Sequence, residues 1–166
     1  MFRPISWQQM PVYNHYYPDA NNQINTPGSA FRLTTEGPTV PVAVGLTAQH
    51  MDVLQRLGQP IPNPISGFAL IDTGASVCML DDSIVNQLSI PPLGTRQIHS
   101  PAGPTQQYTY PASLSFPGTT LPNIAFSDFI SGPLLPTGII ALIGRNVLSS
   151  FVLNYNGPGG HISLSH

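Results

Sequence analysis

Proline and glycine divide this sequence into short segments, and that division constrains the fold more than any other feature. The 166 residues include 19 prolines and 15 glycines. The runs between them are rich in β-branched residues, which is the pattern of short strands joined by turns. The sequence therefore predicts a mainly β fold with two or three short helices, in a chain long enough to bury a real core.

The charge composition bears on the partners of the protein. The chain has no lysine and a formal net charge of −2, so nothing suggests a basic surface for nucleic acid. It has no apolar stretch long enough to span a membrane, and its first residues lack the apolar segment of a signal peptide. We therefore expect a cytoplasmic protein without membrane or nucleic-acid partners.

Metal, cofactor and disulfide chemistry is not indicated either. The five histidines share no metal-ligand spacing, and the common phosphate-loop and nucleophile-elbow motifs are missing from the sequence. We expect no metal and no cofactor. Cys78 is the lone cysteine, so an intrachain disulfide is impossible, and we interpret it as a packed core thiol.

The first part of the chain differs from the rest. Residues 1–37 are polar, rich in Asn, Gln, Tyr and Pro, and show no clean period. We expect an irregular N-terminal arm with one short strand near residues 31–35, and a partly disordered tail is the alternative. Residues 38–166 are expected to form a single domain.

The first half of this domain shows four periodic segments. Residues 39–47 alternate as a strand, and Pro41 favours an edge position. Residues 48–58 predict a short amphipathic helix, and residues 81–88 predict a second one that begins with capping residues. Residues 67–72 form a strand with almost no polar face, so it should be buried on both sides.

The second half reads mainly as strands. Residues 93–116 predict a long hairpin around a turn at 100–105, and a further strand candidate lies at 121–131. Residues 137–156 predict a strand, a turn at Gly144, a brief helix and a returning strand. A link at 157–160 then leads to a terminal strand at 161–165.

Asp72 is a charged residue in an unusual place, at the end of an apolar segment. It ends the apolar run in FALIDTGASVCML, residues 68–80, where an unpaired charge is costly. Gly74 lets the backbone turn and lets another chain approach closely, and the Thr73 hydroxyl can fix the loop. The segment is suited to present a carboxylate rigidly at the floor of a cleft. The alternative is an aspartate that caps a barrel turn without catalysis.

Two segments and their order resemble one protein family. IDTGAS, residues 71–76, is similar to the active-site loop of aspartic proteases, and ALIGRNVL, residues 141–148, resembles the Gly-Arg-Asn element of retroviral proteases. The hairpin at 93–116 lies between them, where that family keeps its flap. The sequence is therefore identified as resembling single-domain retropepsin-like aspartic proteases over about residues 38–166. The fold that this resemblance implies is a closed β-barrel or sandwich with a flap hairpin.

The resemblance implies a mechanism. In that family two aspartates face each other and share one proton, because like charges about 3 Å apart cannot both ionise easily. The ionised partner activates a water that attacks the peptide carbonyl, and the apparent pKa values belong to the pair. This chain has one Asp-Thr-Gly, so the second aspartate would come from Asp72 of a second copy. The implied enzyme is a homodimeric acid endopeptidase that binds an extended peptide or protein substrate.

The resemblance also implies roles for individual residues. Asp72, Thr73 and Gly74 would be catalytic, with Thr73 bonding across the dimer axis. Gly144, Arg145 and Asn146 would act as a structural brace. The residues implied to bind substrate lie after the catalytic triplet and at the flap tip: Ala75, Ser76, Ser100, Pro101, Ala102, Gly103 and Pro104.

The chain departs from the retroviral pattern in three places. Ser76 stands where those enzymes have an aspartate that pairs with the Arg of Gly-Arg-Asn, so Arg145 would use backbone carbonyls, Asp81 or Asp82 instead. Prolines stiffen the flap, and residues 47–66 form an insertion that would edge the cleft or reshape the dimer. These departures keep a second hypothesis open: a catalytically silent dimer of the same fold that binds extended peptides.

Overall fold

The structure is a computed structural model that describes residues 11–100 and 103–166. Its helices and strands follow the chain in this order: β1 (Val12–Tyr16), α1 (Pro27–Glu36), β2 (Thr39–Gly45), α2 (Ala48–Arg56), β3 (Ile65–Ile71), β4 (Met79–Asp81), α3 (Asp82–Gln87), β5 (Gly94–Ser100), β6 (Gly103–Ser115), β7 (Ile124–Gly132), the 3-10 helix η1 (Leu135–Thr137), β8 (Ala141–Ile143), α4 (Arg145–Leu148), β9 (Val152–Asn156) and β10 (His161–Ser165). The mainly β architecture expected from the sequence is confirmed, and the described residues contain four short α-helices.

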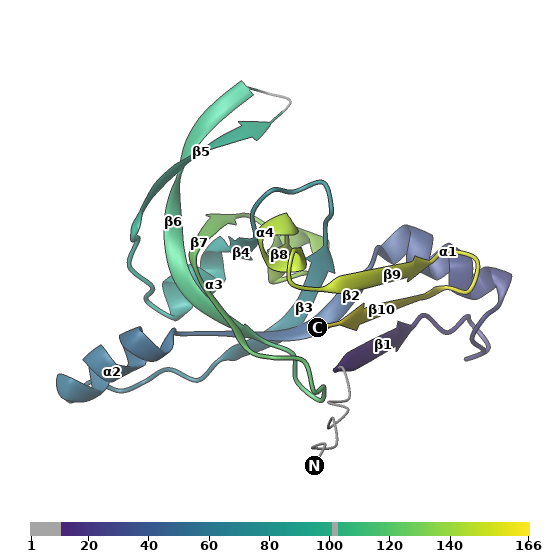
Figure 1. Cartoon of the computed structure of the whole chain (residues 1–166), viewed down its shortest axis with the longest axis horizontal. Helices are drawn as coiled ribbons and strands as arrows, with labels where there is room; N and C mark the ends of the chain where they lie inside the picture. Colours follow the sequence, from purple (N-terminus) through teal and green to yellow (C-terminus); the bar gives the residue numbers. More distant parts are fainter. Residues whose placement is uncertain (1–10, 101–102) are drawn as a thin grey trace, which may run out of the picture.

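The larger sheet closes into a barrel. Its strand order is β2-β3-β8-β4-β7-β6-β5, and β6 also pairs back onto β2. The closing contact aligns Ala43 with Ser115 and Gly45 with Ser113. The edge position expected for Pro41 is therefore only half right, because β2 is paired on both sides at Ala43 and Val44 but with β3 alone at Pro41. β5 extends beyond the barrel as the outer strand of a hairpin with β6 (Figure 1).

A smaller sheet lies beside the barrel. Its order is β1-β10-β9, and both pairings are antiparallel. Figure 1 shows this sheet and α1 extending to one side, away from the β5–β6 hairpin. The terminal hairpin expected from the sequence is present as β9 and β10, and β1 adds a strand that the sequence analysis did not predict.

One hydrophobic core joins both sheets. It includes Val42 and Leu114 of the barrel and Ile162 and Leu164 of β10, all less than 2% exposed. β3 contributes Ala69 and Ile71, but Phe68 remains 49% exposed. The prediction that β3 is buried on both faces is thus wrong, since Ala69 and Ile71 on one face are buried whereas Phe68 on the other is exposed and Leu70 half-buried.

The described part of residues 1–37 corrects the sequence analysis. Residues 12–16 form β1, and the strand expected near residues 31–35 is wrong, because this segment lies in α1. The Thr26 side chain caps α1 by accepting a hydrogen bond from the Ser29 amide, and the Ser29 side chain accepts one from the Thr26 amide. Pro27 occupies the first turn of the helix, and Gly37 follows its end at φ 74°. Pro at the start and Gly past the end is a helix signature that the sequence carried. The boundary between arm and domain stays a prediction.

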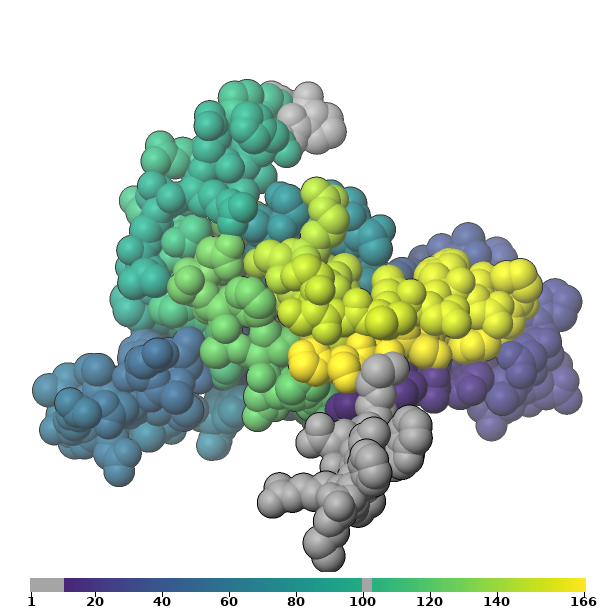
Figure 2. Space-filling model, in the orientation of Figure 1, coloured from purple at the N-terminus to yellow at the C-terminus, as the bar shows by residue number. Residues whose placement is uncertain are grey.

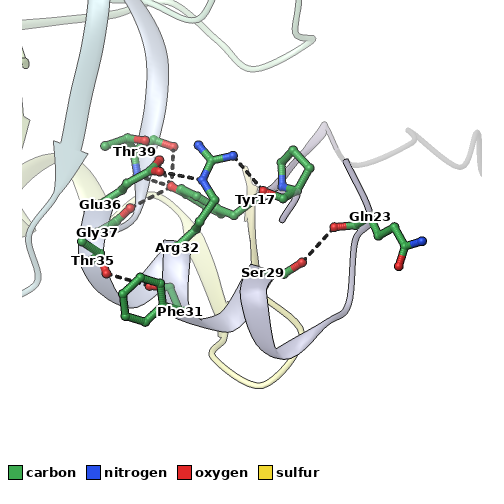
Figure 3. Close-up of polar contacts among 10 residues, drawn as sticks. Tyr17, Gln23, Ser29, Phe31, Arg32, Thr35, Glu36, Gly37 and Thr39 are labelled. Carbon is green, nitrogen blue, oxygen red and sulfur yellow. Dashed lines mark hydrogen bonds and ion pairs between the residues drawn. The ribbon is translucent and has the colours of Figure 1, made fainter. Parts of the chain in front are cut away.

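Tyr17 joins this N-terminal part to the barrel. The side chain is 1% exposed, and its hydroxyl donates to the Gly37 carbonyl at 2.8 Å and accepts from the Thr39 amide at 2.7 Å. Arg32 of α1 donates to the Pro18 carbonyl at 2.7 Å and pairs with Glu36 (Figure 3). Tyr17, which lies 22 residues before Thr39 in the sequence, therefore holds the start of β2 in place.

The helices predicted at 48–58 and 81–88 are both present, as α2 and α3. Asp81 caps α3, as expected, and Ile84 and Val85 face the core. α2 forms too, but it has no buried residue, and it projects from the body in Figure 1. None of the described helices combines the length and apolar character that crossing a bilayer requires.

α2 lies at the far end of β3 from Asp72. Val44 of β2 pairs with Ile65 at the start of β3, and α2 follows β2 directly. Asp72 follows the other end of β3, about 20 Å along the strand at roughly 3.3 Å per residue. The insertion at 47–66 therefore does not edge the Asp72 loop of its own chain.

Candidate active site

The parallel pairing of β3 with β8 builds the site. Ile71 aligns with Ile143, so the two strands end at the same edge of the sheet. Asp72 and Gly144 are the next residues, and the Asp72 amide continues the ladder by donating to the Ile143 carbonyl at 2.9 Å. The two segments that carried the resemblance, 70 residues apart in the sequence, thus lie side by side in the barrel.

The Asp72 carboxylate is oriented by its own loop. Oδ1 accepts hydrogen bonds from the Gly74 amide at 2.8 Å and the Ala75 amide at 3.2 Å. In the part of the chain that the structure describes, no donor reaches Oδ2. A carboxylate held through one oxygen keeps the other free to bind a proton, a water or a second carboxylate.

Arg145 holds the Asp72 loop through the carbonyl groups of its backbone. Its Nη1 donates to the carbonyls of Thr73 and Gly74, each at 2.8 Å, and its amide donates to the Ala75 carbonyl at 2.9 Å. Of the partners left open for Arg145, backbone carbonyls are confirmed. Asp81 is occupied elsewhere: it caps α3 and accepts from the Leu134 and Leu135 amides at 2.7 Å each.

Close backbone packing supports this brace. A Cβ on Gly144 would lie 2.5 Å from the Val77 carbonyl oxygen, so only glycine allows the two segments to approach this closely. Buried Cys78 joins them further: Sγ accepts from the Gly144 amide and donates to Oδ1 of Asn146, each at 3.1 Å. Burial raises the pKa of the Cys78 thiol to about 11, despite opposing hydrogen bonds.

The sequence reasoning identified Cys78 as a packed thiol but not as a link between the two motifs. No local pattern around the residue indicates this role. Its partners Gly144 and Asn146 lie 66 and 68 residues away, so only the fold reveals the contact.

The predicted hairpin is present as β5 and β6. Ser100 pairs with Gly103, whose φ of 110° lies in a region that side chains rarely adopt. Pro104 is exposed on the second strand. Pro101 and Ala102, also expected at the tip, lie outside the described residues. Figure 2 shows the hairpin standing over a hollow in this face of the molecule.

The residues that follow Asp72 in the loop differ in their exposure to solvent. Thr73, Gly74 and Ser76 are exposed, and Ala75 is half-buried. The structure thus groups Asp72 to Ser76 with Gly144 to Asn146 in one site, and the hairpin residues belong to a separate element.

Within residues 11–100 and 103–166, no second aspartate lies beside Asp72. The remaining acidic residues of the described chain are engaged or placed elsewhere: Asp19 caps a turn before α1, Glu36 pairs with Arg32, Asp52 pairs with Arg56, Asp81 caps α3, Asp82 lies exposed in α3, and Asp128 pairs with Arg96. The described residues therefore place a single carboxylate, that of Asp72, at this site. The described residues also contain no cluster of three or more His, Cys, Asp or Glu side chains suited to a metal ion.

Comparison with known proteins gives fold-level likeness only. No protein-family model matches the sequence. No curated protein matches it either. Among solved structures, the chain is similar to a retropepsin-like aspartic protease from Rickettsia conorii, at 11% identity and a TM-score of 0.48 over 100% of this chain and 98% of that one.

Two viral enzymes are similar over a smaller part of the chain. The EIAV protease in complex with an inhibitor has 17% identity and a TM-score of 0.44, over 68% of this chain and 86% of that one. The simian foamy virus protease has 14% identity and a TM-score of 0.40, over 66% and 91%. At these identities the likeness concerns the fold, so any activity has to be inferred from the residues of this chain.

Proposed function

We propose that this protein is an aspartic endopeptidase whose active site forms when two copies bring their Asp72 carboxylates together. The observation that carries the proposal is the Asp72 carboxylate itself, with Oδ1 held by the Gly74 and Ala75 amides and Oδ2 open. A simple turn cap would explain the first oxygen. It would not explain why Arg145 holds the carbonyls of Thr73 and Gly74 from the opposite side of the loop.

The chemistry follows from pairing two such carboxylates. When two carboxylates approach, one keeps a proton and the other stays ionised, and their titration belongs to the pair. The ionised group takes a proton from water while the protonated group donates its proton to the carbonyl oxygen, and the water oxygen bonds to the carbonyl carbon. The C–N bond then breaks: the amine leaves with the proton taken from water, and a hydroxyl of the diol returns a proton to the other carboxylate. The loop is suited to this because a rigid backbone keeps the carboxylates in place while the proton moves.

The need for a second copy is supported by the missing second aspartate and by an open sheet edge. β9 is the outer strand of the smaller sheet, and Val152 and Tyr155 on it are 63% and 48% exposed. An open strand edge with apolar side chains is a ready surface for pairing with another chain. β9 also follows α4, which carries Arg145, so we infer that β9 pairs with β9 of the second copy.

The test is cleavage of a diverse peptide mixture between pH 3 and pH 8, with new termini read by mass spectrometry. The wild type is compared with Asp72→Asn, and Asp82→Asn is the matched control because that exposed carboxylate lies in α3. Sedimentation analysis of the same samples establishes that the dimer is present.

We expect new termini from the wild type and Asp82→Asn and none from Asp72→Asn. Equal traces from wild type and Asp72→Asn, with the dimer present, would contradict the proposal. That result would favour the second hypothesis, a silent dimer that binds extended peptides.

A further inference from the structure

β6 pairs with β7 and β2 from Tyr110 onward, so the outer part of the β5–β6 hairpin, residues 94–109, lies beyond these pairings. β5 is the last strand in the sheet order, and its backbone pairs with β6. The register places Gly94, Arg96 and Ile98 opposite Thr109, Gln107 and Thr105, so these residues share one face of the hairpin. Ile98 and Gln107 on this face are partly buried and Thr109 is buried, whereas the opposite face carries exposed residues such as Gln97 and Tyr108. The face with Arg96 is therefore the inner face.

Arg96 connects this inner face to a strand with which β5 does not pair. Its Nη1 lies 2.6 Å from Oδ2 of Asp128 on β7. The side chains remain 43% and 31% exposed. The contact crosses from β5 to β7 past β6, which requires the hairpin to curl back over the barrel, as Figure 1 shows.

The same aspartate contacts the helix that braces the active-site loop. Oδ1 of Asp128 accepts a hydrogen bond from Nδ2 of Asn146, at 3.4 Å. The Asn146 Oδ1 in turn accepts from the Val147 amide and from the Cys78 thiol, each at 3.1 Å. Asp128 thus stands between the hairpin and α4, with one carboxylate oxygen directed to each.

We propose that Arg96 and Asp128 are positioning residues that fix the height of the hairpin above the Asp72 loop. The proposal rests on the proposed function, because it concerns the space in which a peptide would lie. An ion pair this exposed adds little to global stability. It can still control the hairpin, because a shift of the hairpin relative to β7 breaks this pair without unfolding the barrel.

A distance measurement tests the position directly. Spin labels at Gln97→Cys on the outer face of the hairpin and Asn86→Cys on α3 report the separation of hairpin and body. Labelled chains are diluted with excess unlabelled chains, so that the distances arise within one chain. A sample without introduced cysteines verifies that buried Cys78 takes up no label.

The variants are Arg96→Gln, Asp128→Asn, the double variant and Arg96→Lys. The matched control is Arg56→Gln with Asp52→Asn, which removes another exposed pair, at 2.8 Å, within α2. We expect each single variant to lower the population at the wild-type distance relative to longer distances by about two- to fivefold. The double variant should match the singles, since both remove one interaction. Arg96→Lys should restore part of the effect, and the control should leave the distances unchanged.

A kinetic measurement separates positioning from a general structural effect. If the hairpin position limits peptide binding, KM rises in inverse proportion to the fraction of chains at the wild-type distance, while kcat stays nearly constant. Unfolding midpoints close to that of the wild type show that the variants are folded. The distance data decide the inference even if the wild type cleaves nothing. Unchanged distances in both single variants, or effects that simply add in the double variant, would overturn it.

Discussion

Nη1 of Arg145 lies 2.8 Å from the carbonyl oxygen of Thr73, the residue that follows the candidate catalytic aspartate. The same atom holds the carbonyl of Gly74 at 2.8 Å. A cation is thus used to hold a backbone turn rather than a carboxylate. Ser76 stands at the position where the retroviral enzymes carry an aspartate that pairs with this arginine. In this chain Arg145 bonds to the two backbone carbonyls instead.

The first prediction concerns this brace. Arg145→Ala should lower the free energy of unfolding by about 1–2 kcal/mol, because two hydrogen bonds from a charged but exposed donor are lost. Arg145→Lys should give an intermediate value, since an ammonium lacks the planar geometry of a guanidinium. Denaturant unfolding measures both. Peptide cleavage should fall more steeply than stability, and an Arg145→Ala protein with full cleavage would contradict the role of the brace.

The second prediction concerns Gly144. Gly144→Ala should destabilise the fold by about 1–3 kcal/mol, because the new methyl group meets the Val77 backbone and the two segments must separate. Gly94→Ala is the matched control, since its Cβ would meet only the Thr109 hydroxyl at an ordinary 3.5 Å. Thermal unfolding compares them. Equal melting temperatures for the two variants would show that the close approach at Gly144 is unimportant.

The third prediction concerns the reactivity of Cys78. Burial raises the pKa of the thiol to about 11 and keeps reagents away, so near pH 8 the native protein should react with a thiol reagent far more slowly than the denatured protein. Asn86→Cys supplies an exposed cysteine in the same chain as the internal standard. Rapid labelling of both cysteines in the native state would contradict the packing described for Cys78.

The fourth prediction is a pH dependence set by Asp81. Burial acts to raise the pKa of Asp81, but hydrogen bonds from Ser83, Leu135 and Leu134 outweigh it and hold the pKa below the ordinary 3.8. A lowered folded-state pKa means that Asp81 stabilises the fold above pH 3.8 and that this contribution is lost as the pH falls through the lower folded value.

Unfolding measured from pH 2 to pH 7 tests this dependence. Asp81→Asn should be less stable than the wild type at neutral pH, and the difference should shrink toward pH 2. Asp82→Asn, the change in the adjacent exposed carboxylate, should follow the wild-type curve. A constant difference between Asp81→Asn and wild type at all pH values would contradict the assignment.

The fifth prediction concerns the dimer edge. Val152→Lys with Tyr155→Lys should raise the dimer dissociation constant by about tenfold or more, because charges on an exposed strand edge oppose pairing with another chain. Both side chains are already exposed, so the stability of the single chain should be nearly unchanged. Sedimentation equilibrium measures the constant. Val12→Lys on β1, the opposite edge of the same sheet, is the control, and a larger effect there would move the interface to β1.

Local patterns in the sequence determined most of the elements. Period-two alternation gave β2, capping residues gave α3, and the punctuation by Pro and Gly gave the β5–β6 hairpin. Asp72, Thr73, Gly74 and Arg145 could be selected as candidate site residues because their residue types stand in a recognisable order. The helix α1 was missed although Pro27 and Gly37 marked its ends, because its polar surface hid the period.

Contacts between distant residues could be decided only by the tertiary structure. Arg145 binds two backbone carbonyl oxygens. Because every residue has a carbonyl, the residue types in the sequence do not indicate which ones Arg145 binds. The Arg96–Asp128 pair and the thiol contact of Cys78 likewise join segments 32 to 68 residues apart. A sequence specifies which groups are available, whereas the parallel pairing of β3 with β8 decides which of them meet around Asp72.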